Sequence, residues 1–137
     1  MTDPLRFTRL DSGYGDAAVA PHHLSTAAAL DIMASGGTAV DGAIAANAVQ
    51  GVVAPETCGV GGDLFALVYS PDQKTPAVLN ASGRAGRGAD AQALRNAGHA
   101  TVPFTHPEAV TVPGCVEGWS ELIERFGRLP LARVLEP

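Results

Sequence analysis

The sequence predicts an α+β fold in which a pair of apolar helices packs on an antiparallel sheet. Two helical patterns follow each other in the first half of the chain, and a β-hairpin pattern comes next. No regular alternation of strands and helices is present, so a doubly wound parallel sheet is not expected. The length of 137 residues allows one domain with a core, but not two.

The first helix is predicted from Pro21 onward, after a short strand near residues 17–20. Apolar side chains recur at helical spacing, at Leu24, Ala27, Ala28 and Ile32. Gly36 and Gly37 should end this helix, because glycine readily adopts the left-handed conformation that closes a helix.

The second helix is predicted over residues 39–53. Thr38 should cap its N-terminus, and Asp41, three positions later, completes a pattern like a capping box. Nearly every position of this helix is small or apolar, so we expect it to lie inside the protein, between other elements.

The hairpin is predicted from a strand over residues 64–69, a turn at Pro71 and Asp72, and a returning strand over residues 77–79. These runs are rich in residues that suit a strand. The turn residues between them favour a direct return of the chain, so an antiparallel pair is expected.

A less regular region follows the hairpin. A short surface helix is predicted over residues 90–97, ending at Gly98. Two prolines mark residues 101–107 as a loop, and residues 110–112 are predicted to form a third strand.

The last long helix is predicted over residues 116–126 and has two distinct faces. Its apolar face comprises Val116, Trp119, Leu122, Ile123 and Phe126. The charged residues expected to point outward are Glu117, Glu121, Glu124 and Arg125. Gly127 should close the helix, and another helix is expected to start at about residue 131.

Composition and charge exclude several classes of partner. The net charge is −5 and the nine basic residues are scattered, so no nucleic-acid partner is expected. The longest apolar stretch, residues 43–55, contains Asn47, Gln50 and Gly51, so no membrane-spanning helix is expected. No signal peptide is visible at the N-terminus, which predicts a cytoplasmic protein.

The cysteines and histidines show no metal-binding pattern. Cys58 and Cys115 are far apart and have no evident base beside them, so both are predicted to be reduced, inert thiols. The four histidines are His22, His23, His99 and His106. The adjacent pair is not expected to point the same way, and no metal site is predicted.

Glycines cluster between the second helix and the first strand, at positions 59, 61 and 62. Their free N–H groups could cradle a phosphate. A phosphate loop, however, leads into the N-terminus of a helix, whereas these glycines lead into a strand. The favoured interpretation is a tight turn at which two backbone segments approach each other closely.

Arg84 follows the hairpin among small residues. An arginine presented at the end of a strand can form a bidentate pair with a carboxylate. It can equally be a solvated loop arginine, which is the simpler interpretation from the residues alone. These residues by themselves leave the function open.

Four motifs, taken in order, resemble the γ-glutamyltransferase (γ-glutamyltranspeptidase) family. They are PHHLS with ASGGTAVDGA at residues 21–43, VVAPE with GVGGDLF at 52–65, AVTVPGCVEGW at 109–119 and FGRLP at 126–130. Four motifs in the right order are much more specific than any one of them. Residues 15–137 are identified as the N-terminal portion of the family's large subunit, and residues 1–14 as a lead-in segment.

The resemblance implies part of an N-terminal-nucleophile hydrolase, a four-layer αββα sandwich that cleaves itself into two subunits. In this family the N-terminal threonine of the small subunit attacks a γ-glutamyl amide such as glutathione, with its own α-amine as base. That threonine lies past residue 137, so no catalytic residue is assigned here and the chain alone should be inactive. No cofactor is implied. The implied partners are a γ-glutamyl substrate, the rest of the large subunit and the small subunit.

The family's arginine that pairs with the α-carboxylate of the glutamyl group aligns with Arg84. Arg87 is a rival, because Ala85, Arg87 and Gly88 replace the Glu and Ala-Pro that follow the arginine in the family. Such departures keep open an acylase-type relative that acts on another amide. The way the sequence ends, part-way through a helical pattern, keeps open a stand-alone remnant with a binding or assembly role.

Overall fold

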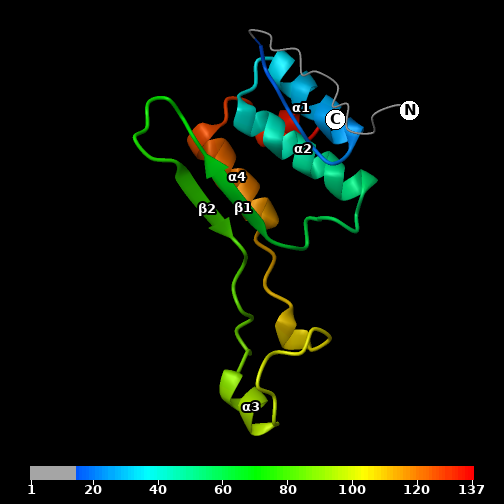
Figure 1. Cartoon of the computed structure of the whole chain (residues 1–137), viewed down its shortest axis with the longest axis vertical. Coiled ribbons are helices and arrows are strands. Elements are labelled where there is room, and N and C mark those ends of the chain that lie inside the picture. Colours follow the sequence, from blue (N-terminus) through cyan, green and yellow to red (C-terminus); the bar gives the residue numbers. More distant parts are fainter. Residues whose placement is uncertain (1–14) are drawn as a thin grey trace, which may run out of the picture.

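The computed structural model describes residues 15–137, and the lead-in segment predicted for residues 1–14 lies outside the described residues. The elements in chain order are α1 (His23–Ala34), α2 (Ala39–Val53), β1 (Leu64–Val68), β2 (Ala77–Ala81), α3 (Ala91–Asn96), a 3-10 turn (Pro107–Ala109), α4 (Cys115–Phe126) and α5 (Leu131–Val134). Helices α1 and α2 pack side by side, and α4 lies between α2 and the hairpin β1–β2 (Figure 1). The predicted α+β fold is confirmed.

Helix α1 begins after His22, whose Nδ1 accepts a hydrogen bond from the Leu24 N–H at 3.2 Å. Gly36, with a φ of 97°, ends the α1 turn in the left-handed conformation that was predicted. His22 lies outside the helix in an extended conformation, which lets its ring stack on that of His23 with centroids 4.5 Å apart. The prediction that the two side chains diverge was therefore wrong.

The capping box predicted for α2 is present, and it reaches further than the helix. The Thr38 N–H donates to the Asp41 carboxylate at 2.6 Å, and the Asp41 N–H donates to Thr38 Oγ1 at 3.3 Å. The same carboxylate accepts the backbone N–H of Arg128 at 3.0 Å. Since Asp41 is completely buried, one side chain joins the start of α2 to the segment that follows α4.

Helix α2 is enclosed on fewer sides than its composition predicted. Its inner face includes the buried Gln50, which accepts a hydrogen bond from the Ser25 hydroxyl at 2.8 Å and donates to Thr57 Oγ1 at 3.2 Å. On the opposite side, Val52 is 79% exposed. The prediction of burial holds for the faces toward α1, α4 and α5, because those are the neighbours that the described residues provide.

Strands β1 and β2 pair antiparallel, with Leu64 opposite Ala81 and Val68 opposite Ala77. The residues that pack against the core are Leu64, Ala66, Val68 and Leu79. Helix α4 lies directly on this face, since a Cβ on Gly118 would stand 2.7 Å from Leu64 Cδ2 and 2.9 Å from Ala81 Cβ. The other face leaves apolar side chains exposed, among them Phe65, Leu67, Tyr69 and Val78.

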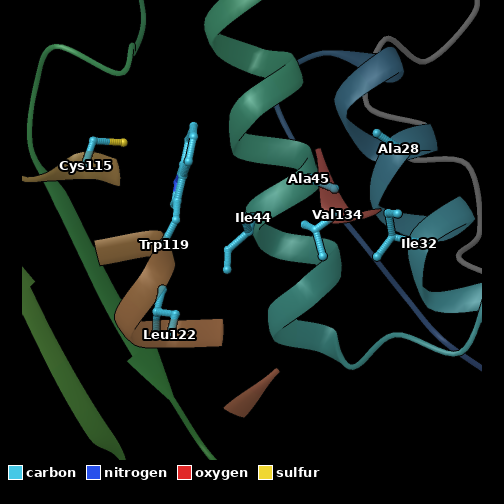
Figure 2. Packing of buried hydrophobic residues seen from close by; sticks show 8 residues of the cluster. All are labelled: Ala28, Ile32, Ile44, Ala45, Cys115, Trp119, Leu122 and Val134. Atoms are coloured by element: carbon cyan, nitrogen blue, oxygen red, sulfur yellow. The ribbon is translucent and has the colours of Figure 1, made fainter. Parts of the chain in front are cut away.

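The hydrophobic core lies between α4, α2 and α1, with α2 in the middle (Figure 2). Its labelled members are Cys115, Trp119 and Leu122 of α4, Ile44 and Ala45 of α2, Ala28 and Ile32 of α1, and Val134 of α5. Val116 was predicted to belong to the apolar face of α4 but is exposed, and the preceding residue, Cys115, is buried instead. The helix begins one residue earlier than its apolar pattern indicated.

Between β2 and α4 the chain makes a long excursion, residues 85–111, that carries α3 away from the core (Figure 1). The surface helix predicted to end at Gly98 is present, and Gly98 has a φ of 87°. Asp90, which was predicted to lie in the helix, is its N-cap. The strand predicted over residues 110–112 is wrong, because its pairing is confined to an isolated bridge at Val112.

The strand predicted near residues 17–20 is also absent, and the Ala20 N–H donates to the Thr26 hydroxyl oxygen instead of a neighbouring strand. Across residues 15–137, no helix is long and apolar enough to span a membrane.

Candidate functional site

Arg84 lies at the point where the hairpin ends and the excursion begins. The Val112 N–H donates to the Arg84 carbonyl at 2.8 Å, which forms the isolated antiparallel bridge. Gly83, just before it, has a φ of 81°, and a Cβ there would stand 2.0 Å from the Val112 carbonyl oxygen. The backbone position of Arg84 therefore depends on a glycine at position 83.

The N-terminus of α4 reaches the same point from the other side. A Cβ on Gly114 would stand 2.3 Å from the Ala81 carbonyl oxygen. The Gly62 carbonyl accepts the N–H groups of Gly114 and Cys115, each at 3.1 Å, and so caps α4 in place of a side chain. The glycine turn is a site of close backbone approach, as predicted, and it does not lead into a helix.

A cavity of about 310 Å³ lies beside this junction. The end of β2 with Gly83 and Arg84 forms one part of its lining, and Glu117, Gly118 and Glu121 of α4 form another. Arg84 is exposed and forms no ion pair with any carboxylate among residues 15–137. The cavity, which we call the Arg84 cavity, is therefore lined by an arginine that has no carboxylate partner among the described residues.

Arg87, the rival arginine, lies in an exposed turn of the excursion that is closed by a 2.9 Å hydrogen bond from the Ala89 N–H to the Gly86 carbonyl. The lining of the Arg84 cavity includes Arg84 and not Arg87. Glu117 and Glu121, which were predicted only to point outward, also line it. Helical periodicity could not reveal this. It separates buried from exposed positions, but it does not show which residues of a distant segment lie next to an exposed position.

Sequence reasoning missed Asn47, which joins both thiols to the core. Its Oδ1 accepts the Trp119 indole N–H at 2.9 Å and the Cys115 thiol at 3.9 Å, and its Nδ2 donates to Cys58 Sγ at 3.8 Å. Cys115 is buried and Cys58 half-buried. Burial raises the pKa of the Cys115 thiol, and the nearby Cys58 and Asp63 side chains raise it further. The inert thiol predicted from the sequence is consistent with this environment at Cys115.

We expect iodoacetamide to alkylate Cys115 at least about tenfold more slowly than a free thiol at pH 7.5, because alkylation needs the thiolate and a raised pKa lowers the thiolate fraction. Mass spectrometry of timed samples measures the rate, and the urea-unfolded protein serves as the control. Labelling of Cys115 at the unfolded rate would contradict its burial.

Among residues 15–137, two of the histidines act as caps of short backbone segments. His106 Nδ1 accepts the Glu108 N–H at 3.4 Å and caps the 3-10 turn, much as His22 caps α1. The part of the chain that the structure describes contains no group of three His, Cys, Asp or Glu residues that could hold a metal ion.

Comparison with known proteins decides the family. The sequence profile described as Gamma-glutamyltranspeptidase matches residues 25–137. The chain belongs to the γ-glutamyltranspeptidase family.

Within this family, the chain is similar to proteins of differing activity. It is 39% identical over 120 residues to a glutathione hydrolase-like proenzyme of Bacillus subtilis, and 43% identical over 124 residues to an oxamate amidohydrolase proenzyme of Klebsiella pneumoniae. These alignments cover 87% and 86% of this chain but 22% and 23% of those relatives. The chain thus spans less than a quarter of the length of either relative, and both are made as proenzymes.

Solved structures of the γ-glutamyltranspeptidase family share the fold. The γ-glutamyltranspeptidase of Pseudomonas nitroreducens, complexed with L-DON, matches with a TM-score of 0.79 at 29% identity, over 92% of this chain and 38% of that chain. A cephalosporin acylase from Bacillus halodurans matches with a TM-score of 0.75 at 39% identity, over 83% of this chain and 21% of that chain. The fold predicted from the motifs, part of an N-terminal-nucleophile hydrolase, is confirmed.

Proposed function

We propose that the full-length protein cleaves γ-glutamyl amides such as glutathione, and that this chain is the N-terminal portion of its large subunit. In this proposal the glutamyl group passes to water or to an amino acid. Arg84 binds the α-carboxylate of the glutamyl group. The observation that carries the proposal is the placement of Arg84 in a cavity wall with no carboxylate partner among the described residues.

The role of this chain in the reaction is binding and orientation. The nucleophile is the N-terminal threonine that self-cleavage creates in the small subunit; its hydroxyl attacks the amide carbon and its α-amine takes the proton. The guanidinium of Arg84 forms two parallel hydrogen bonds with the α-carboxylate, which orients the remote amide toward the threonine. The 137-residue chain by itself, which lacks that threonine, is expected to be inactive.

Replacing Arg84 by alanine in the full-length enzyme should raise the KM for γ-glutamyl-p-nitroanilide by about a hundredfold, because a bidentate charge-assisted pair is lost. Lysine at this position keeps the charge but cannot donate two parallel hydrogen bonds, so the KM of R84K should fall between those of R84A and the parent enzyme. Steady-state kinetics of p-nitroaniline release measures the effect.

Arg87→Ala is the matched control and should change KM by less than about threefold. A normal KM in R84A would refute the assignment, and a raised KM in R87A alone would transfer it to Arg87.

A second candidate function is hydrolysis of another carboxylate-bearing amide. It is favoured by the 43% identity to an oxamate amidohydrolase and by the changed residues after Arg84. Oxamate and γ-glutamyl amides both carry a carboxylate as well as an amide, so Arg84 could serve either. Ammonia release from oxamate, measured beside p-nitroaniline release from the γ-glutamyl substrate, separates the two functions.

A further inference from the structure

We infer that Cys58 and Cys115 form a redox-active pair, which hydrogen peroxide converts into a disulfide between the segment after α2 and the N-terminus of α4. Neither cysteine lines the Arg84 cavity. The inference therefore concerns a separate modification site, and it holds whichever amide the full-length enzyme cleaves.

Both thiols contact one residue, Asn47 of α2. Asn47 Nδ2 donates a hydrogen bond to Cys58 Sγ at 3.8 Å, and the Cys115 thiol donates to Oδ1 of the same amide at 3.9 Å. The Cys58 thiol in turn donates to the backbone carbonyl of Asn47 at 3.9 Å. The two sulfur atoms therefore lie beside the same amide group, although they come from segments that are far apart in the sequence.

The backbone also brings the two cysteines together. Gly59, which directly follows Cys58, accepts the Gly62 N–H at 3.2 Å, and the Gly62 carbonyl accepts the Cys115 N–H at 3.1 Å. A single tight turn thus links the backbone beside Cys58 to that of Cys115. A disulfide joins cysteines whose Cα atoms are about 4.4–6.8 Å apart. A Cβ on Gly59 or Gly61 would meet nothing within 4 Å, so the segment that carries Cys58 has room to reach this separation.

The two thiols differ in their access to solvent. Cys58 is half-buried and lines a cavity of about 370 Å³ beside the end of α2, which a molecule as small as hydrogen peroxide can enter. Cys115 is buried and does not line this cavity. Its pKa is raised by burial and, to a smaller extent, by the nearby Cys58 side chain, which disfavours its thiolate. Cys58 is therefore the thiol that meets the oxidant.

The reaction takes place in two steps. The Cys58 thiolate attacks one oxygen of hydrogen peroxide and breaks the O–O bond, which leaves a sulfenic acid on Cys58 and releases hydroxide. The Cys115 thiolate then attacks the Cys58 sulfur and displaces its hydroxyl group as a second hydroxide. The two protons of the thiols convert both hydroxides to water, and the two electrons lost by the thiols reduce the peroxide. A small thiolate fraction at Cys115 suffices, because its target is held beside it.

The test treats the reduced full-length enzyme with hydrogen peroxide and maps its tryptic peptides by mass spectrometry without reduction. Trypsin places Cys58 in the peptide of residues 10–74 and Cys115 in the peptide of residues 96–125. We expect these two peptides to appear as one linked species, lighter than the reduced pair by two hydrogen atoms. Dithiothreitol should separate them again.

Two single variants test the order of the steps. In Cys115→Ser the sulfenic acid on Cys58 has no thiol to attack it, so dimedone, a reagent for sulfenic acids, should label Cys58 more strongly than in the parent enzyme. In Cys58→Ser the Cys115 thiol should be lost at least about tenfold more slowly than in the parent enzyme, because it meets peroxide only from a buried position. Circular dichroism reports whether each variant folds.

Three results would overturn the inference. One is dimedone labelling of Cys58 that is as strong in the parent enzyme as in Cys115→Ser, with no linked peptides. Another is loss of the Cys115 thiol at the same rate in the parent enzyme and in Cys58→Ser. The third is retention of both free thiols under conditions that oxidise the urea-unfolded protein. None of these readouts uses enzymatic activity, so a failure of the proposed function leaves the test intact.

Discussion

Replacing Asp41 by alanine should lower the free energy of unfolding by about 4 kcal/mol, because it removes a buried carboxylate that accepts hydrogen bonds from two backbone N–H groups. The Asp41 carboxylate accepts the N–H of Thr38 at 2.6 Å and the N–H of Arg128 at 3.0 Å. The first bond starts α2, and the second attaches the segment after α4 to that start. The N-terminus of α2 and the segment at Arg128 should therefore be destabilised together. Urea unfolding followed by the fluorescence of Trp119, the only tryptophan, measures the loss.

Two further variants separate the causes of that loss. Asp41→Asn keeps one acceptor oxygen but sets an N–H donor against another N–H, so it should cost roughly half as much as alanine. Asp31→Ala removes an exposed aspartate from α1 and should change stability by less than about 0.5 kcal/mol. An Asp41→Ala protein as stable as the Asp31→Ala protein would show that water readily satisfies both N–H groups.

Replacing Gly83 by alanine should cost more than about 3 kcal/mol, because two separate penalties coincide at this position. Its φ of 81° is unfavourable for a residue with a side chain. In addition, a Cβ would stand 2.0 Å from the Val112 carbonyl oxygen, which belongs to a backbone and cannot rotate away. The bridge between Arg84 and Val112 should open, so the variant should also lose affinity for carboxylate-bearing substrates in the full-length enzyme.

The chain provides matched glycines that isolate each penalty. Gly98 has a φ of 87°, but a Cβ there would have nothing within 4 Å, so Gly98→Ala should cost about 1 kcal/mol from backbone strain alone. Gly86 has neither a positive φ nor a close neighbour, so Gly86→Ala should be nearly neutral. Equal losses for Gly83→Ala and Gly98→Ala, measured by urea unfolding, would mean that the hairpin end relaxes and that the contact with Val112 does not restrict position 83.

Asp41 and Gly83 stabilise different parts of the molecule. Asp41 joins the helix pair to the end of α4, and Gly83 joins the hairpin to the segment that leads into α4. Helix α4 is thus positioned at both of its ends by contacts with residues far away in the sequence. The Arg84 cavity depends on the second of these contacts, because α4 supplies the glutamates opposite the hairpin end.

Local features of the fold were predictable from neighbouring residues. The capping box of Thr38 and Asp41, the left-handed glycines at positions 36 and 98, and the hairpin all follow from interactions within a few residues. The predictions that failed concern segments whose structure depends on residues far away in the sequence. Residues 110–112 have strand-forming composition but find a partner only at Arg84, so they form a bridge and not a strand.

The sequence by itself determined the order of the elements, the caps and the family, because these depend on short-range chemistry and on motifs that stand in the chain in a fixed order. Only the tertiary structure decided that Asp41 also binds the Arg128 N–H, that Asn47 links two thiols to Trp119, and that Glu117 shares a cavity with Arg84. Each of these contacts joins segments that helical or strand periodicity treats separately. Periodicity tells which side of an element is buried, whereas the packing of glycine backbones and the core decides what lies opposite.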